Sequence, residues 1–167
     1  MSDTPEYASG LAAAQFGVLF PSTVLSTVAF SCKSTAEQIN PVRNIDVLGM
    51  QNFFDHAGNL VNGSLGAMAV IMVGSLVENA TTGENKRPVL LAVAGATAAT
   101  AVNVAYEAGV YIPPYPKKPA EAGFDGHDAV YGSVAGILYS VVFCGAAIRQ
   151  RRRLTKQNKQ ASLLETM

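Results

Sequence analysis

The feature that most constrains this chain is an uncharged stretch of twenty residues that ends directly at a cluster of arginines. The stretch covers residues 129–148 and reads AVYGSVAGILYSVVFCGAAI. An α-helix of this length would measure about 30 Å, which matches the hydrocarbon core of a bilayer. We therefore predict a transmembrane helix. Arg149, Arg151, Arg152 and Arg153 follow it, and because arginine clusters resist translocation, we expect the C-terminal tail to be cytoplasmic.

Charged residues make up only 14% of the 167-residue chain, against about 25% in a typical soluble domain. They are missing from four long windows. We therefore predict an all-α integral membrane bundle of four transmembrane helices, with both termini in the cytoplasm. The expected helices cover about 10–32, 60–77, 89–106 and 129–148 within one transmembrane domain at 1–148, and a basic cytoplasmic tail follows at 149–167.

The first predicted helix contains Pro21 in its middle. Proline removes one backbone hydrogen bond and clashes with the preceding turn, so we expect the helix to kink there. Nearby Ser and Thr hydroxyls, such as those of Thr23 and Thr27, can bond the backbone groups that are freed. Residues 1–6 contain no Lys or Arg, so we expect a retained helix rather than a cleaved signal peptide.

The distribution of Lys and Arg supports this orientation. Six lie in the tail and two at residues 86–87, all on the predicted cytoplasmic side, against four in the predicted outer loops. Without the tail the bias would reverse to two against four, so the orientation depends on the arginine cluster. The balance of 12 basic and 12 acidic residues offers no surface for nucleic acid. The expected location is the plasma membrane.

Small residues form three stripes at helical spacing. Because lipid gives helices no hydrophobic reason to associate, they pack by close backbone approach at such residues. The stripes are Gly132, Gly136, Ser140 and Cys144; Ala92, Ala96, Ala99 and Asn103; and Gly63, Gly66, Ala67 and Gly74. We expect these stripes to face each other, with Leu138, Val142 and Phe143 facing lipid or a partner. The alternative is that transmembrane helices are simply rich in Gly and Ala.

The predicted topology gathers polar side chains at the outer interface. They are Asp55, His56, Asn59, Asn62, Asn103, Tyr106, Glu107, His127, Asp128 and Tyr131. His56 and His127, with Glu107 and Asp128, would be a sufficient ligand set for zinc or another divalent metal. Glu107 and Asp128 are also the candidate catalytic residues.

A simpler alternative explains the same residues. Acidic side chains such as Asp55 and Asp128 are favoured at helix N-termini by the helix dipole, and His56 and His127 would then be solvated loop residues. The sequence contains no H-E-x-x-H, C-x-x-C or nucleophile-elbow spacing. We expect no organic cofactor.

Two segments of the chain, one beginning at Asp55 and one at Glu107, resemble the VanZ-like membrane proteins. These are small multi-helix bacterial proteins associated with glycopeptide resistance. That family has an Asp-Lys-x-x-His pattern before one helix, which is similar to residues 55–59 here, although His56 and Asn59 replace the Lys and the His. It also has a Glu before a loop that leads to an Asp and a Gly-rich helix, similar to Glu107, Asp128 and the glycines that follow. The resemblance covers about a third of the chain.

Three functions remain open. The first is a non-catalytic structural, accessory or interaction subunit of a membrane assembly. The second is a VanZ-like protein or small membrane enzyme that uses the outer polar cluster on a lipid or cell-envelope substrate. A channel or transporter is the third and is least supported, because mid-helix positions are apolar or small. Expected partners are the bilayer, other membrane proteins or a second copy, and anionic lipid headgroups at Arg149, Arg151, Arg152 and Arg153.

Overall fold

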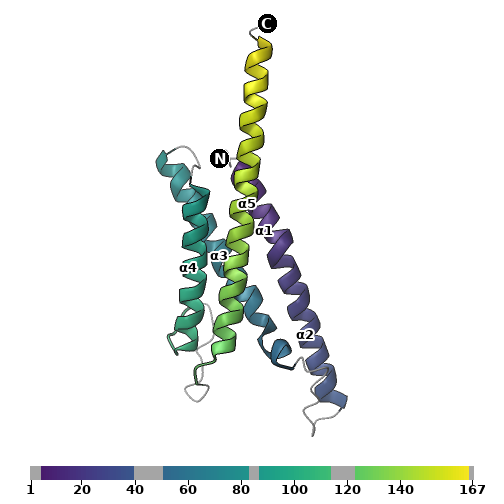
Figure 1. Cartoon of the computed structure of the whole chain (residues 1–167). Helices are drawn as coiled ribbons and strands as arrows, with labels where there is room; N and C mark the ends of the chain where they lie inside the picture. Colours follow the sequence, from purple (N-terminus) through teal and green to yellow (C-terminus); the bar gives the residue numbers. More distant parts are fainter. Residues whose placement is uncertain (1–4, 40–50, 83–86, 114–122, 166–167) are drawn as a thin grey trace.

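A computed structural model of the protein describes residues 5–39, 51–82, 87–113 and 123–165 (Figure 1). Every regular element in these ranges is helical. The elements are α1 (Pro5–Ala14), the π-helical turn η1 (Gln15–Leu19), α2 (Phe20–Ile39), α3 (Gln51–Thr82), α4 (Pro88–Glu107) and α5 (Gly126–Glu165). Four stretches are long and apolar enough to cross a membrane: Pro5–Thr35, His56–Thr82, Pro88–Glu107 and Gly126–Leu164. The predicted all-helical chain with four such spans is confirmed.

Helix α5 is the element around which the others are arranged. It packs against α1, α3 and α4, while α3 and α4 also pack against each other and α2 packs against α3. Figure 1 shows α5 continuing far beyond the other helices toward the C-terminus, with the N-terminus of the chain at this same end of the bundle. The tail from Arg149 onward is therefore a helical extension of the fourth span through Glu165.

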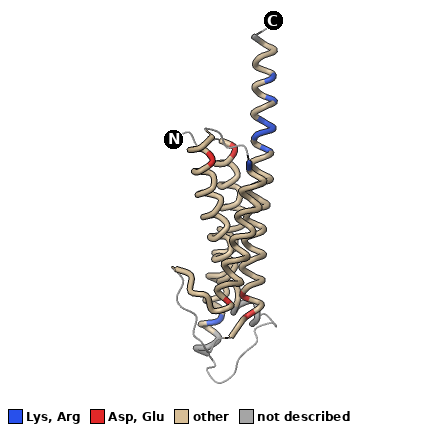
Figure 2. The backbone as a smooth tube through the Cα atoms, turned by 90° about the vertical axis from the view of Figure 1, so that its left-hand side faces the viewer, with Lys and Arg blue, Asp and Glu red and all other residues tan. Residues whose placement is uncertain are grey.

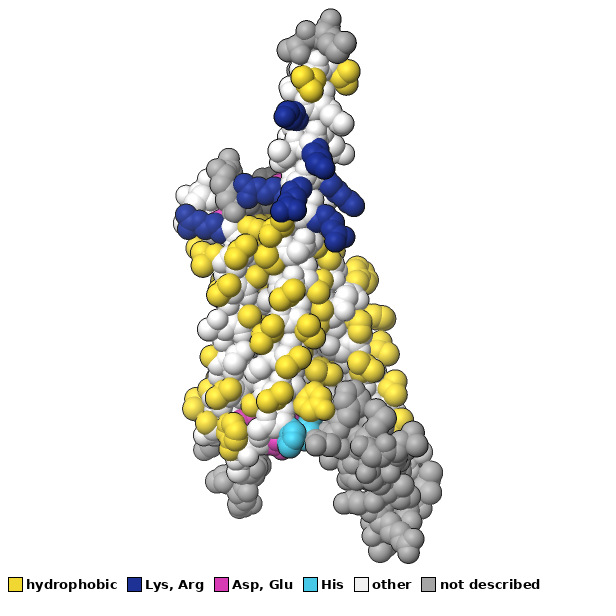
Figure 3. Space-filling view, in the orientation of Figure 1, with side chains coloured by type: hydrophobic (Ala, Val, Ile, Leu, Met, Phe, Trp, Pro, Cys, Tyr) yellow, Lys and Arg dark blue, Asp and Glu magenta, His cyan; other side chains and the backbone are white. Residues whose placement is uncertain are grey.

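The surface between the two ends of the bundle is apolar. In Figure 3, hydrophobic side chains lie along the face between two polar groups. Lys and Arg side chains gather toward the C-terminal end of α5, and His and acidic side chains lie at the opposite end of the bundle. Figure 2 shows the basic residues following one another along the projecting part of α5. This distribution is what an apolar membrane core bounded by two aqueous faces requires.

The first span contains a wide turn directly before Pro21. The N–H of Phe20 bonds to the carbonyl of Gln15, five residues earlier, which defines the π-helical turn. Since Pro21 has no N–H and its ring would clash with the carbonyl of Gly17 in a regular α-helix, the wider turn accommodates it. The structure thus has a π-helical turn directly before Pro21, where the sequence predicts a kink. Thr23 donates to the Leu19 carbonyl at 2.9 Å.

The closest approach between helices occurs at the small residues of α3 and α5. A Cβ on Gly63 would collide with the backbone carbonyl of Gly132, and a Cβ on Gly136 would collide with the side chain of Ala99 in α4. The side chain of Asn103 lies against Gly132. Three helices therefore meet at positions where even a methyl group is too large.

The remaining small residues of the stripes lie near this contact. Ala92 is buried, and Gly66 faces Ala99 across the interface between α3 and α4. Ala96 is only partly buried, whereas Gly95 is buried. The buried face of α4 is therefore turned slightly away from the predicted stripe.

Phe143 was expected to face lipid or a partner, and this expectation is wrong. Its side chain is fully buried and meets the ring of Tyr7 edge to face, with 5.6 Å between the ring centroids. The physical reason is a notch in α1, where Gly10 has no side chain and the Phe143 ring fills the space. Leu138 is half exposed and Val142 is partly buried.

Tyr7 also connects three helices at the arginine end of the bundle. Its hydroxyl donates to Oε2 of Glu78 in α3 at 2.9 Å and accepts the backbone N–H of Arg87, directly before α4, at 3.0 Å. The ring is 3% exposed. Since an unpaired buried hydroxyl is costly, this network favours one position of α1 against the ends of α3 and α4.

The glycine contact gives a direct test of this packing. Replacing Gly63 by Ala places a methyl group inside the Gly132 carbonyl, so the helices must separate. We expect a loss of about 1–3 kcal/mol, the usual range for overpacking, and a lower thermal midpoint in detergent.

Gly145→Ala is the matched control. No described atom lies within 4 Å of a Cβ at this α5 position, so the variant should be as stable as the original chain or slightly more stable. Equal midpoints for Gly63→Ala and Gly145→Ala would contradict the packing at Gly63.

Candidate functional site

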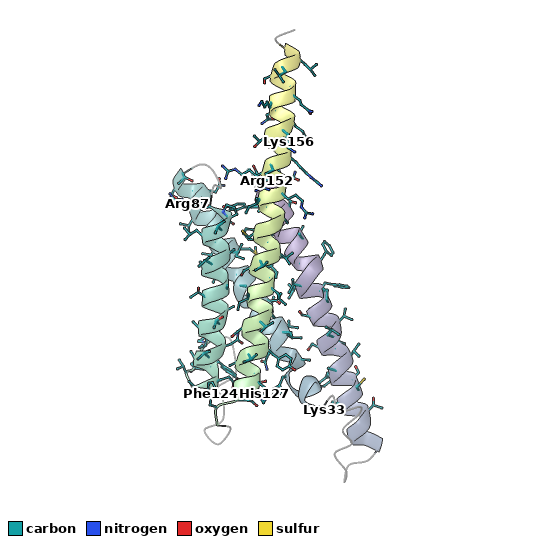
Figure 4. The ribbon with its side chains drawn as sticks, viewed as in Figure 1. Lys33, Arg87, Phe124, His127, Arg152 and Lys156 are labelled. Carbon is teal, nitrogen blue, oxygen red and sulfur yellow. The ribbon has the colours of Figure 1, made fainter. Side chains whose placement is uncertain are left out.

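The candidate site lies at the end of the bundle opposite the arginines, where α3 and α5 begin. Figure 4 shows His127 at this end, with Arg87 and Arg152 at the other. His56 lies seven residues, two helical turns, before Gly63, and Asp128 lies four residues, about one turn, before Gly132. The close contact between these glycines therefore turns His56 and Asp128 toward each other.

Asp128 joins the two helices through its carboxylate. Its Oδ1 lies 2.5 Å from Nδ1 of His56 and also accepts the side-chain N–H of Asn59. His56 and Asn59 are three residues apart, so they lie on one face of α3. The side chains of His56 and Asp128 are 13% and 26% exposed. Because an ionised carboxylate only accepts, this contact places a proton on Nδ1 of His56.

Three aromatic rings lie side by side at this point. The His56 ring is nearly parallel to that of His127, with centroids 5.4 Å apart, and to that of Tyr131, with centroids 5.8 Å apart. His127 and Tyr131 are four residues apart and so share one face of α5. The two histidines of the protein, distant in the sequence, are therefore neighbours.

Asp125 caps the N-terminus of α5. Its Oδ1 accepts the backbone N–H of His127 at 2.9 Å and of Asp128 at 3.4 Å, and its carbonyl accepts the N–H of Ala129. Desolvation opposes ionisation, but the two backbone donors and the electrostatic influence of the neighbouring His56 and His127 outweigh it and lower the pKa of Asp125. Asp125 is not among the site residues predicted from the sequence, although an Asp directly before a helix start is a recognised capping signal.

Glu107 lies at the predicted end of the bundle, next to the segment that leads into α5. It is buried at the end of α4, and its Oε2 accepts the backbone N–H of Asp125 at 3.2 Å. Glu107 thus connects α4 to the segment that leads into α5. The carboxylates beside the histidine rings are those of Asp128, at His56, and of Asp125, whose Oδ1 lies 3.7 Å from Nδ1 of His127.

Two other polar residues of the predicted cluster, Asn103 and Asp55, do not contribute to this site as described. Asn103 donates to the carbonyl of Ala99, one turn earlier in α4, at 2.7 Å, and its contact with Gly132 makes it part of the helix packing. The side chain of Asp55 lies outside the described residues.

A metal ion is the chemical species that this cluster suits. His56, Asp125 and His127 each offer one ligand atom, and these atoms all lie within 4.8 Å of one another. The group keeps both predicted histidines but contains Asp125 in place of Glu107 and Asp128. Asp128 is not a member of this group, and its carboxylate contacts Nδ1 of His56 instead.

Comparison with protein-family models, with curated proteins and with solved structures gives no match. The resemblance to VanZ-like proteins therefore stays a prediction that depends on the residues quoted for it. The geometry of the site is the guide to its chemistry.

The capping role of Asp125 predicts how two substitutions differ. Asp125→Ala removes the acceptor for two backbone N–H groups and should cost about 1 kcal/mol of stability, whereas Asp125→Asn keeps an equivalent acceptor and should cost much less. The measurement is the thermal midpoint of the purified protein in the presence of a chelator. Equal losses in the two variants would contradict the capping role.

Proposed function

We propose that this chain is a non-catalytic interaction subunit of a membrane assembly. The observation that carries the proposal concerns the first span, Pro5–Thr35, in which the 18-residue apolar window has a mean hydropathy of 1.5 and is 17% buried. The corresponding values for Gly126–Leu164 are 1.7 and 39%. A helix that is less covered by its own bundle should be more apolar in order to face lipid. The first span shows the reverse, so we infer that a partner covers it.

The exposed face of α2 has the residues that such a contact needs. Thr23, Thr27 and Ser31 follow one another at four-residue spacing, and all three are exposed. The hydroxyls of Thr23 and Thr27 already bond to carbonyls one turn earlier in the helix. Between the exposed apolar side chains of α2, this stripe of small residues lets a neighbouring transmembrane helix approach closely.

The arginine end supports a cytoplasmic C-terminus and a contact with anionic lipid at the plasma membrane. A groove on α5 is lined by Gly145, Ile148, Arg149, Arg152, Arg153 and Lys156. Its lining passes from Gly145 and Ile148 to four basic side chains, and Figure 3 shows Lys and Arg side chains at the edge of the apolar band. Cationic side chains at this depth attract the headgroups of acidic phospholipids, and salt weakens the attraction.

A second candidate is a small membrane enzyme, VanZ-like or otherwise, that acts on a lipid or cell-envelope substrate. The contact between His56 and Asp128 favours it, because a carboxylate on Nδ1 orients an imidazole as a general base. The variant Asp128→Asn distinguishes the two candidates. An enzyme should lose its activity on the substrate, whereas an interaction subunit should keep its partners.

The test of the proposal is purification of the C-terminally tagged protein from its native membrane in mild detergent. We expect other membrane proteins in fixed proportion, with anionic phospholipid that is lost at high salt. The double variant Thr23→Leu with Thr27→Leu should lower partner recovery at least tenfold, since bulky side chains block close approach.

Val141→Leu is the matched control, because Val141 is 61% exposed and the substitution adds bulk to α5 rather than to α2. It should keep the partners. Recovery of the protein alone or as a homo-oligomer would contradict the proposal. Equal recovery from the α2 double variant and the original chain would exclude α2 as the contact.

A further inference from the structure

We propose that His56, Asp125 and His127 bind one divalent transition-metal ion and that Zn²⁺ occupies this site. The proposal goes beyond the interaction function and does not depend on it. It requires only the end of the bundle where α3 and α5 begin.

The spacing of the three side chains is the first argument. Their ligand atoms lie within 4.8 Å of one another, while a tetrahedral zinc ion with ligand bonds of about 2.0–2.1 Å holds its ligands about 3.4 Å apart. The difference is small enough for side-chain rotation to close. The His127 side chain is 66% exposed and its ring lies on that of His56, another member of the site, so its solvent-facing side leaves room for this movement.

The second argument is that His56 is already oriented as a metal ligand. Metal-bound histidines usually donate their other ring N–H to a carboxylate, which fixes the tautomer and the ring direction. Asp128 supplies this carboxylate to Nδ1 of His56, and Asn59 holds the same carboxylate oxygen. Nε2 of His56 is then the nitrogen available to the ion.

Asp125 is also held in place before any ion binds. Its Oδ1 accepts the backbone N–H groups of His127 and Asp128. A carboxylate has about four lone-pair sites on its two oxygens, so the capping bonds leave capacity for a metal. The capping role fixes the position of Asp125, and the metal would use the remaining oxygen lone pairs.

The ligand types select the metal. Imidazole nitrogens suit Zn²⁺, Ni²⁺ and Cu²⁺, whereas Mg²⁺ and Ca²⁺ prefer sites made of oxygen ligands. Three protein ligands leave one position of a tetrahedral ion open, as in catalytic rather than structural zinc sites. Because Asp125 is 39% exposed and His127 is 66% exposed, water can reach that position.

The experiment uses the full-length protein in mild detergent, purified on a histidine-free tag, stripped with a chelator and titrated with Zn²⁺. We expect one Zn²⁺ per chain and no comparable binding of Mg²⁺. Binding should raise the thermal midpoint, because an ion that joins α3 to α5 binds only the folded chain. Co²⁺ should give the intense visible absorption of a tetrahedral ion.

Three variants assign the site. His127→Gln and Asp125→Asn each remove one ligand and should abolish stoichiometric binding, while Asp125→Asn keeps the helix cap. Asp128→Asn removes the group that orients His56, and it should weaken Zn²⁺ binding by about 10–100-fold. Thermal midpoints in chelator separate lost binding from lost folding.

Cys32 provides the matched control, since it is exposed and could bind zinc by itself. Cys32→Ser should bind Zn²⁺ as tightly as the original chain. Loss of binding in Cys32→Ser, unchanged binding in His127→Gln and Asp125→Asn, or no stoichiometric binding by the folded original chain would each overturn the proposal.

Discussion

The backbone contact between Gly63 and Gly132 is the constraint on which the rest of the structure depends. In lipid, two helices gain little from burying apolar side chains, so close approach at small residues decides how they cross and in which register. Here the crossing also determines chemistry, because His56 lies two turns before Gly63 and Asp128 about one turn before Gly132. A different register between α3 and α5 would separate the carboxylate from the imidazole.

The two ends of the bundle are held by different interactions. At the arginine end, the buried Tyr7 hydroxyl connects α1 to α3 and α4 through Glu78 and the backbone of Arg87. At the opposite end, Glu107 and Asp128 connect α4 and α3 to the start of α5. These interhelical hydrogen bonds lie at the two ends of the apolar band, and small residues govern the close packing between them. The second half of the first span takes little part in this core, and its exposed face is where we place a partner.

The sequence predicted those features that depend on composition or on spacing within one helix. Four uncharged windows indicated four spans, and the spacing of Gly132 and Gly136 indicated a close helix contact. Features that depend on which helix lies opposite could not be predicted in this way. Phe143 is buried only because Gly10 of α1 happens to face it. Asp125 was recognisable as a cap, but its place beside the histidine rings follows from the register of α3 and α5.

We propose that the bundle crosses a membrane with the histidine cluster on one side and the arginine tail on the other. Labelling with a membrane-impermeant thiol reagent tests it most directly, using single cysteines introduced as Tyr111→Cys, Val141→Cys and Lys156→Cys after Cys32→Ser and Cys144→Ser. All three positions are exposed in the fold, so only a bilayer can protect them differently. We expect labelling at residue 111 in intact cells, at residue 156 only after permeabilisation, and at residue 141 in neither case. Labelling at residues 111 and 156 from the same side, or at residue 141 in intact membranes, would contradict it.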